Sequence, residues 1–497
     1  MFYNFMKTKI NWLEWSNESF EKAKKEGKPI LLDLTAVWCH WCHVMDSVSY
    51  SNDEIAEVIN KDFVPIKVDI DKRPDIKERY NMGGFPSTVF LDAEGKIIAG
   101  ETYVPPDRLK LVLESVKNFY KSSKDEIKKN ITGLEEERKF KEIKNTKINE
   151  SIIKKILLSL EDNFDSSYGG FGLQPKFPSP EAIDLLFLEY QKTKIKKYLD
   201  MALKSLDGMH EVIYDKIDLG FFRYSVTRDW KEPHYEKMLD TNAGLLRNYA
   251  AAFSITKDEK YRKTAIGIIS YANKFLSDQK NFGFYGSQDA NEEFYNLNAE
   301  ERRQKKQPNV DKTIYVDWNA MMISSYIKVG EILGDKKAIE FAIKTSDFIL
   351  KNCYDGKNGF FHFFDGKPNI SGILSDNVYF LNCLVDVYLA SQRKDYLEKI
   401  NQIAQFILRN FYDGKNYGFF DRMLKEDDFG TLRLRDKNFL ENSFAAFVFL
   451  RIYFLTKEDD YKKAAEKTLL HFEGSCLKFG YFAAMYAIAV DMLLKYG

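Results

Sequence analysis

The sequence predicts a multidomain protein of mixed class, in which a small α/β domain precedes an all-α toroid of six helical hairpins. Two observations lead to this prediction. The first 125 residues alternate apolar runs typical of buried strands with helical stretches, and from residue 149 onward a helix followed by a Gly-aromatic turn recurs six times. A charge-dense segment separates the two patterns. We therefore predict an α/β domain over 1–125, a charged helix or linker over 126–148, and a toroid over 149–497.

The composition limits the classes of function. With 497 residues and 44% hydrophobic content, the chain can form two or three cores. Its 74 basic residues balance its 74 acidic ones, so the net charge favours neither nucleic acid nor an anionic membrane, and we find no apolar run of the ~18 residues that a membrane span needs. Five cysteines are too few for a disulfide framework, which suits a reducing cytosol. We expect a cytoplasmic protein with no nucleic-acid or membrane partner.

The α/β domain is predicted from the order of its elements. An apolar run over 29–37 predicts a strand, and the hexapeptide 38–43, Trp-Cys-His-Trp-Cys-His, opens an amphipathic helix. The elements expected after it are a strand over 63–70, a helix ending near Tyr80, strands over 86–92 and 96–99, and a closing helix after Asp107. The predicted order is β-α-β-α-β-β-α.

Cys39 and Cys42 form a Cys-x-x-Cys pair at the start of the first predicted helix, a spacing typical of redox dithiols. A helix N-terminus places the Cys39 sulfur against unpaired backbone N–H groups and the positive end of the helix dipole, which favours thiolate over thiol. His40 can add a second stabilising charge. We predict Cys39 as the attacking thiolate and Cys42 as the resolving thiol.

Two other interpretations of these cysteines have less support from the sequence. A zinc site needs two more ligands at matched spacing, but the remaining cysteines, Cys353, Cys383 and Cys476, are isolated far downstream. The hexapeptide also satisfies the pattern for covalent c-type haem attachment, which calls for an exported chain, and we see no export signal in the first dozen residues. We predict no metal and no cofactor.

At Trp38 to Cys42, Asp33 and Pro86 the first 125 residues resemble thioredoxin. The resemblance implies that Asp33 is the buried carboxylate that handles the proton of the second cysteine, and that Pro86 is the cis proline facing the dithiol. The chain departs from thioredoxin in having His40-Trp41 where thioredoxin has Gly-Pro. A histidine there should make the disulfide more oxidising, and the bulky Trp41 should restrict which partner can dock.

The toroid is predicted from the repeat after residue 149. The Gly-aromatic turns are Gly170-Phe171, Gly220-Phe221, Gly283-Phe284, Gly359-Phe360, Gly418-Phe419 and Gly480-Tyr481. A helix candidate precedes each turn, and a second helix, richer in apolar and small residues, follows it. This alternation predicts inner helices buried on all sides and outer helices with a charged face. An open solenoid would need polar caps at both ends, so the apolar last helix, 481–494, favours a closed ring.

The connections within the hairpins should gather at one end of the ring axis and form a funnel. Their aromatic and polar residues suit a sugar, because rings stack on C–H faces and hydroxyl groups need paired donors and acceptors. The candidate site residues are Arg223, Tyr224, Trp230, His234, Glu236, Asp289, Trp318, Asn319, His362 and Asp376.

Three interpretations of these residues stay open. His234 and His362 fit the acid and base of an epimerase that moves the proton α to a sugar carbonyl. Asp289 and Asp376, or Glu236, fit instead the carboxylate pair of a glycoside hydrolase. Alternatively, the aromatic residues seal the ends of the core and the charged residues cap helices.

Seven motifs extend the resemblance over nearly the whole chain. They are Trp38-Cys-His-Trp-Cys-His-Val-Met45, Pro175-Lys-Phe-Pro178, Arg223-Tyr-Ser-Val226, Pro233-His-Tyr-Glu-Lys-Met-Leu239, Asp289-Ala290, Trp318-Asn319 and Asn442-Ser443. Together they resemble the spermatogenesis-associated, thioredoxin-domain-containing family, found from archaea and bacteria to animals. The resemblance implies a thioredoxin-like domain fused to a toroid similar to N-acylglucosamine epimerases and glucuronyl hydrolases.

The chain departs from this family pattern twice within the predicted funnel. In Met238-Leu-Asp-Thr-Asn-Ala243 the acidic residue is displaced by one position, and Asn291 replaces a carboxylate in Asp289-Ala-Asn291. The sequence therefore predicts a thiol-disulfide oxidoreductase-like module with a protein thiol or disulfide partner, joined to a toroid that acts on or binds a sugar-like small molecule. A scaffold with an unused dithiol is the remaining alternative.

Overall fold

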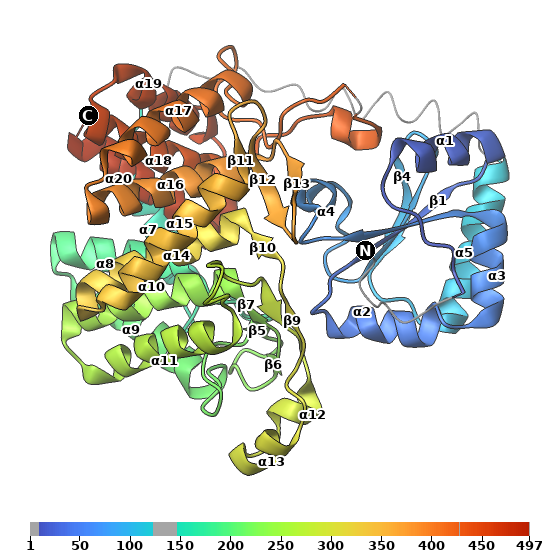
Figure 1. Ribbon diagram of the computed structural model, residues 1–497, viewed down its shortest axis with the longest axis horizontal. Helices are drawn as coiled ribbons and strands as arrows, with labels where there is room; N and C mark the ends of the chain where they lie inside the picture. Colours follow the sequence, from blue (N-terminus) through green and yellow to red (C-terminus); the bar gives the residue numbers. More distant parts are fainter. Residues whose placement is uncertain (1–8, 123–146, 427, 497) are drawn as a thin grey trace. The chain divides into compact units, whose positions relative to one another are not determined.

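The computed structural model describes residues 9–122, 147–426 and 428–496. These residues form two compact units, one of residues 1–142 together with 424–435 and one of residues 143–423 together with 436–497 (Figure 1). Nearly all of the segment predicted as a charged helix or linker, 126–148, lies outside the described residues.

The first unit is built on a four-stranded sheet with the order β2-β1-β3-β4. Its strands are β1 (Ile30–Thr35), β2 (Val64–Asp69), β3 (Ser87–Leu91) and β4 (Ile97–Glu101). Strand β1 pairs in parallel with β2 and antiparallel with β3, and β3 pairs antiparallel with β4. Every residue of β1 is buried, which explains its continuous apolar run and makes it the centre of the unit.

The helices of the first unit follow the predicted order. They are α1 (Asn17–Glu26), α2 (His40–Val44), a π-helical turn (Met45–Ser49), α3 (Asp53–Asp62), α4 (Pro74–Tyr80) and α5 (Pro106–Ser122). Asn52 caps α3 by accepting the N–H of Ile55, and Pro74 opens α4 at a position where a missing N–H costs nothing. Helix α1 is an addition to the predicted β-α-β-α-β-β-α order, which is confirmed.

A segment from late in the chain, 424–435, completes the first unit. Phe429 stacks on Trp15 with ring centroids 5.7 Å apart. The Thr431 hydroxyl donates to the Tyr80 hydroxyl over 2.8 Å, and Arg79 donates to the Leu434 carbonyl over 2.7 Å. The sequence pattern assigns this segment to the toroid, because nothing in its composition distinguishes it from the other hairpin connections.

The second unit is a closed ring of helical hairpins. Its inner helices are α8 (Pro180–Thr193), α10 (Leu239–Thr256), α14 (Val316–Leu333), α16 (Leu374–Ser391), α18 (Phe439–Thr456) and α20 (Ala484–Tyr496). Its outer helices are α7 (Glu150–Asn163), α9 (Lys196–Val212), α11 (Glu259–Phe275), α15 (Lys336–Asn352), α17 (Lys394–Asn410) and α19 (Asp459–Phe472). Each inner helix contacts the next, and α20 contacts α8, so the toroid is confirmed and the open solenoid is not.

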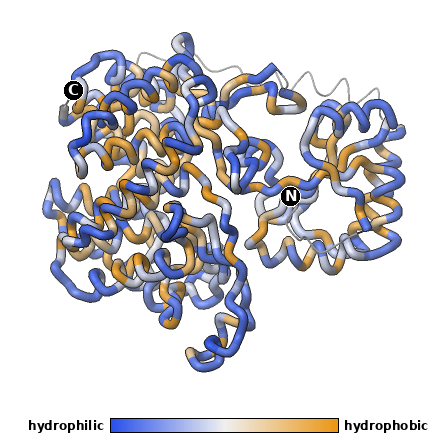
Figure 2. The backbone as a smooth tube through the Cα atoms, in the orientation of Figure 1, coloured by the Kyte–Doolittle hydropathy of each residue, from blue (hydrophilic) through white to orange (hydrophobic). Residues whose placement is uncertain are grey.

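Hydropathy separates the two layers (Figure 2). Outer helices such as α17 bury one stripe, including Ile400, Ile403 and Ile407, and expose charged residues on the other side. Inner helices bury most of their circumference. Two helical segments, Phe439–Thr456 and Cys476–Lys495, are long and apolar enough to cross a membrane. No apolar run of that length was expected from the sequence. Both segments pack against neighbouring inner helices of the ring.

The long connections from outer to inner helices contain the short elements of the second unit. These are β5 (Tyr224–Ser225), β6 (Pro233–His234), β7 (Lys237–Met238), β8 (Ser287–Gln288), α12 (Glu292–Tyr295), α13 (Ala299–Gln304), β9 (Val310–Asp311), β10 (Ile314–Tyr315), β11 (Tyr354–Asp355), β12 (Gly359–Phe364), β13 (Pro368–Ser371) and η3 (Cys476–Ala483). The returning inner-to-outer turns span only a few residues. All inner helices therefore run in one direction, with their N-termini at the end that holds the long connections.

The second to fifth Gly-aromatic turns are held by asparagines of the inner helices. In the fifth repeat the Asn442 side chain accepts the N–H of Phe419 over 2.6 Å and donates to the carbonyl groups of Phe419 and Asn438. Gly418 has φ 79, and a Cβ there would lie 3.1 Å from the Asn442 side-chain oxygen. Asn242, Asn319 and Asn377 accept the N–H of the equivalent phenylalanine in their repeats.

We expect Asn442→Ala to lower the free energy of unfolding of the toroid by about 3 kcal/mol, because it leaves buried backbone groups of Phe419 without partners. The measurement is urea unfolding of the full chain followed by circular dichroism. Asn410→Ala is the matched control, because Asn410 makes a single side-chain bond to the Phe406 carbonyl of an outer helix. Equal effects of the two substitutions would contradict the role of the asparagine in holding the turn.

Candidate functional site

The dithiol lies where the central strand of the first unit enters a helix. Cys39 is the N-cap of α2 and is disulfide-bonded to Cys42. The Cys39 Sγ accepts the backbone N–H of Cys42 over 3.2 Å. Both cysteines are nearly buried, with exposures of 4% and 2%. A Cys39 thiolate formed on reduction could accept the same N–H at the start of α2, an arrangement that stabilises a thiolate.

Aromatic side chains surround the disulfide. The Trp38 indole N–H donates to the Asp71 carboxylate over 2.5 Å and is buried. Trp41 is 44% exposed and packs against Tyr103, with ring centroids 5.2 Å apart. The peptide bond before Pro86 is cis. An exposed apolar ring beside a buried disulfide provides a surface on which a polypeptide can dock.

The core of the first unit holds a buried set of charges. Asp33 on β1 and Lys67 on β2 are paired across the parallel strands, with Lys67 Nζ 3.2 Å from Asp33 Oδ2. The same ammonium lies 2.5 Å from Asp46 Oδ1. The Tyr50 hydroxyl donates weakly to Asp33 Oδ1 over 3.5 Å. One cation therefore serves two buried carboxylates.

The pKa values follow from this imbalance. Burial raises the pKa of Asp33, the ammonium of Lys67 opposes this, and the carboxylate of Asp46 adds to it, so that the pKa is about 6. Burial lowers the pKa of Lys67, but the two carboxylates outweigh it and raise the pKa above its usual value. Asp33 can therefore exchange a proton near neutral pH while Lys67 stays charged.

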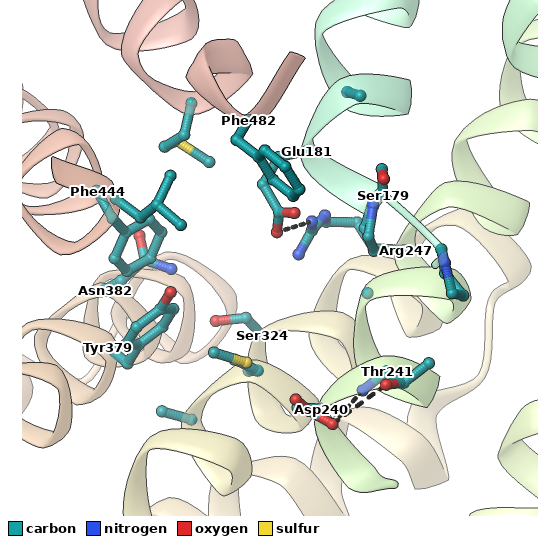
Figure 3. Close-up of a pocket in the computed structure, with 18 of the residues that line it drawn as sticks. Ser179, Glu181, Asp240, Thr241, Arg247, Ser324, Tyr379, Asn382, Phe444 and Phe482 are labelled. Atoms are coloured by element: carbon teal, nitrogen blue, oxygen red, sulfur yellow. Dashed lines mark hydrogen bonds and ion pairs between the residues drawn. The ribbon is translucent and has the colours of Figure 1, made fainter. Parts of the chain in front are cut away.

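The toroid contains a central cavity of about 320 Å³ at the N-terminal ends of its inner helices (Figure 3). Every inner helix or the turn before it contributes to its wall. The polar and aromatic lining residues include Ser179, Glu181, Asp240, Thr241, Arg247, Ser324, Tyr379, Asn382, Phe444, Tyr481 and Phe482. None of the ten residues predicted for the toroid site lines this cavity directly.

Acidic residues recur where the inner helices begin. Glu181 lies on α8, Asp240 on α10, Asp317 on α14, Asp376 on α16 and Glu441 on α18, each in the first turn of its helix. The positive end of a helix dipole favours a carboxylate at this place. Because all inner helices start at the same end of the ring, these residues form an acidic ring around its axis.

Arg247 places a positive charge in the cavity wall. Its Nη2 lies 2.6 Å from Asp184 and 3.6 Å from Glu181 (Figure 3). Desolvation raises the pKa of Glu181, whose side chain is half exposed, and Arg247 opposes this shift while Asp184 adds to it. Burial likewise raises the pKa of Asp240, and the charge of Asp317 adds to the rise. These carboxyl groups hold a proton more readily than they would in water.

Two of the predicted toroid residues, His362 and Asp376, form one contact pair. The His362 Nδ1 lies 2.9 Å from Asp376 Oδ1, and both side chains are buried. The ring of Tyr315 lies 5.7 Å from the His362 ring and 4.7 Å from the Trp318 ring, so Trp318 belongs to the same neighbourhood. Asp317, which precedes Trp318, completes a cluster with His362 and Asp376.

A second group of predicted residues stacks in the connection before α10. Tyr224 lies between Phe177 and His234, with centroid distances of 4.3 Å to each. His234 Nδ1 is 3.6 Å from the buried carboxylate of Glu236. The Arg223 guanidinium lies 5.5 Å from the Tyr224 ring. Tyr224, His234, Glu236 and Arg223 therefore lie together, whereas the other histidine of the predicted acid–base pair, His362, belongs to the group around Tyr315 and Asp376.

The remaining predicted residues have other surroundings. Trp230 is buried and its indole N–H donates to the Tyr168 carbonyl over 3.3 Å. The Asn319 side chain is bonded to the backbone of Phe284 and Tyr315. Asp289 follows β8, and its charge is among those that raise the pKa of Tyr295.

The cavity residues were missed because they lie inside helices. Glu181, Arg247, Ser324, Tyr379 and Asn382 fall within segments whose apolar content predicts a core role. Arg247 and Asn382 could have indicated the cavity from the sequence, because a guanidinium and an amide in the middle of inner helices need polar partners.

The fold and the dithiol together define a thioredoxin-like domain joined to an (α/α)6 toroid. Residues 2–138 match the family described as protein of unknown function DUF255, Thioredox_DsbH. Spermatogenesis-associated protein 20 of Homo sapiens is 26% identical over 591 residues, which cover 91% of this chain and 74% of that protein. Disulfide bond reductase DsbH of Chlamydia pneumoniae is 31% identical over 107 residues, 19% of this chain and 64% of that protein.

Solved structures resemble the toroid. D-mannose isomerase superposes with a TM-score of 0.55 at 14% identity, covering 70% of this chain and 97% of that one. Cellobiose 2-epimerase from Bacillus thermoamylovorans B4167 superposes with a TM-score of 0.54 at 12% identity, covering 66% of this chain and 88% of that one. At these identities the likeness concerns the fold. The family resemblance drawn from the sequence motifs is confirmed.

Asp33→Asn should change how stability depends on pH. Since the pKa of Asp33 is raised from 3.8 to about 6, its contribution to stability is complete below pH 3.8 and is lost as the pH rises through 6. Relative to Asp33→Asn, the unmodified protein should lose about 2 kcal/mol of unfolding free energy between pH 4.5 and 7.5. Urea unfolding of the oxidised proteins at both pH values measures this difference, and a constant difference would contradict the raised pKa.

Proposed function

We propose that the first unit is a thiol-disulfide oxidoreductase that reduces disulfides of other proteins. The observation that supports it most is the Cys39–Cys42 pair at the N-terminus of α2, above a buried carboxyl group with a pKa of about 6. The similarity to a relative named as a disulfide bond reductase supports the reducing direction.

The proposed cycle transfers two electrons. The Cys39 thiolate attacks a substrate disulfide, forms a mixed disulfide and releases the first substrate sulfur as a thiolate, which takes a proton from water. Cys42 then loses its proton to Asp33 and attacks Cys39, forming the Cys39–Cys42 disulfide and releasing the second substrate thiolate. The protein dithiol is oxidised and the substrate is reduced. A second dithiol reductant is required to restore Cys39 and Cys42.

Asp33 suits the proton step because of its surroundings. A carboxyl group with a pKa near 6 is ionised at pH 7 and still basic enough to take up a proton. Lys67 remains charged and stabilises the carboxylate between cycles. Trp41, exposed beside the disulfide, would contact the substrate polypeptide.

A redox titration with trapping tests this proposal. We expect a reversible two-electron transition between about −120 and −270 mV, measured by alkylation and intact mass. Cys42→Ser should accumulate mixed disulfides with protein partners, because the resolving thiol is missing. The matched control is the double variant Cys39→Ser with Cys42→Ser, which should trap none. A pair that stays reduced throughout this range would overturn the proposal.

We further propose that the toroid binds a sugar-like small molecule in its cavity. Aromatic faces of Tyr379, Phe444 and Phe482 line the same space as the polar groups of Arg247 and Asn382 (Figure 3). This combination suits a molecule with apolar C–H faces and several hydroxyl groups. The fold likeness to D-mannose isomerase agrees with this ligand class.

Calorimetric titration with free hexoses, N-acetylhexosamines and disaccharides tests the cavity. For any sugar that binds, Ser324→Leu should weaken affinity at least tenfold, because the added side chain occupies the cavity. Ser270→Leu on the exposed side of α11 is the matched control and should leave affinity unchanged. NMR spectra of the incubated sugar then separate an isomerase from a binding module. Binding that Ser324→Leu does not weaken would place the ligand elsewhere.

A further inference from the structure

We propose that Asp317, His362 and Asp376 form a binding site for a divalent metal ion beside the toroid cavity. Asp317 and Asp376 lie one helical turn before Ala320 and Tyr379, which line the cavity. The three residues come from different elements, α14, β12 and α16. Each offers one ligand atom, and these atoms lie within 4.8 Å of one another. Asp317 precedes His362 by 45 positions and Asp376 by 59, and no local motif links the three, so the sequence pattern does not indicate this site.

An unpaired oxygen points to a missing ligand. Asp376 is fully buried, and its Oδ1 is used by His362. Its Oδ2 is buried and has no hydrogen-bond partner among the residues that the structure describes. Leaving a buried carboxylate oxygen without a partner is unfavourable, so such an atom needs an explanation. A metal ion bound by the cluster would supply it.

The distances fit small divalent ions. Nitrogen and oxygen ligands that bond to an ion at about 2.1 Å lie roughly 3 Å apart when they occupy neighbouring positions. The His362 Nδ1 and Asp376 Oδ1 are 2.9 Å apart. An ion that replaces this hydrogen bond takes Nδ1 and Oδ1 as ligands, and bidentate ligation by Asp376 then uses Oδ2 as well. One imidazole and two carboxylates suit Mn²⁺ or Zn²⁺, with water in the remaining positions.

The surroundings favour a cation. Asp240 lies close enough to Asp317 for their charges to interact, and the other members of the acidic ring begin neighbouring helices. Ser375 donates to Asp317 Oδ2 over 3.4 Å and can orient this carboxylate. Negative potential beside the cavity attracts a divalent ion before any specific contact forms.

This site extends the function proposed for the toroid but does not depend on it. An ion beside the cavity could ligate hydroxyl or carbonyl oxygens of a molecule bound there. The ion would bind whether or not a sugar does. Failure of sugar binding and failure of metal binding are therefore separate results.

Mn²⁺ binding to the full-length, chelator-treated protein tests the proposal. We expect close to one bound ion per chain, measured by electron paramagnetic resonance of free Mn²⁺ and by elemental analysis after dialysis. The protein should be oxidised at Cys39–Cys42, so that thiolates do not compete. The melting temperature should also rise with Mn²⁺ or Zn²⁺, as expected for a ligand that binds the folded state.

Two variants remove ligands and one serves as the control. His362→Asn and Asp317→Asn should each weaken Mn²⁺ binding at least tenfold while the circular dichroism spectrum stays native. Asp240→Asn removes a neighbouring charge but no ligand, and should weaken binding less than threefold. Stoichiometry below 0.1 per chain, or equal losses in all three variants, would overturn the site and assign any attraction to the acidic ring alone.

Discussion

Four inner helices begin where an asparagine holds the Gly-aromatic turn that precedes them. Asn242, Asn319, Asn377 and Asn442 bond to the backbone of that turn from the first turn of their own helices. The residues one and two positions before each asparagine are thereby placed at the same height around the ring. Four of the five members of the acidic ring, Asp240, Asp317, Asp376 and Glu441, are among these residues. The geometry of the acidic ring therefore depends on asparagine–backbone hydrogen bonds that do not involve a ligand.

Buried lysines have two different uses in this protein. In the toroid, Lys176, Lys237 and Lys437 each pair with one aspartate of a turn and with a carbonyl group, which braces the connection. In the first unit, one lysine, Lys67, serves both Asp33 and Asp46. Each of these three lysines neutralises the charge of the one aspartate that it contacts. Burial, which the shared lysine opposes only in part, leaves Asp33 with a pKa of about 6.

Much of the architecture was predictable because it depends on local chemistry. The Cys39–Cys42 spacing, the apolar strand before it and the glycine turns are short-range signals, and the helices they predict agree with the structure to within a few residues. Tyr224, His234 and Glu236 lie together because they are close in sequence. The packing of 424–435 onto the first unit had no such signal, because Phe429 contacts Trp15 and Thr431 contacts Tyr80 at separations of 414 and 351 positions.

The sequence by itself determined the two kinds of domain, the redox pair and the number of hairpins, because each depends on residues that act within one turn or one strand. Only the tertiary structure decided which polar side chains share a cavity. Closing the ring brings Glu181, Arg247 and Tyr379 to one space and Asp317, His362 and Asp376 to one cluster. These groups come from different hairpins, and a helical period specifies the face on which a residue lies but not the helix that the face will meet.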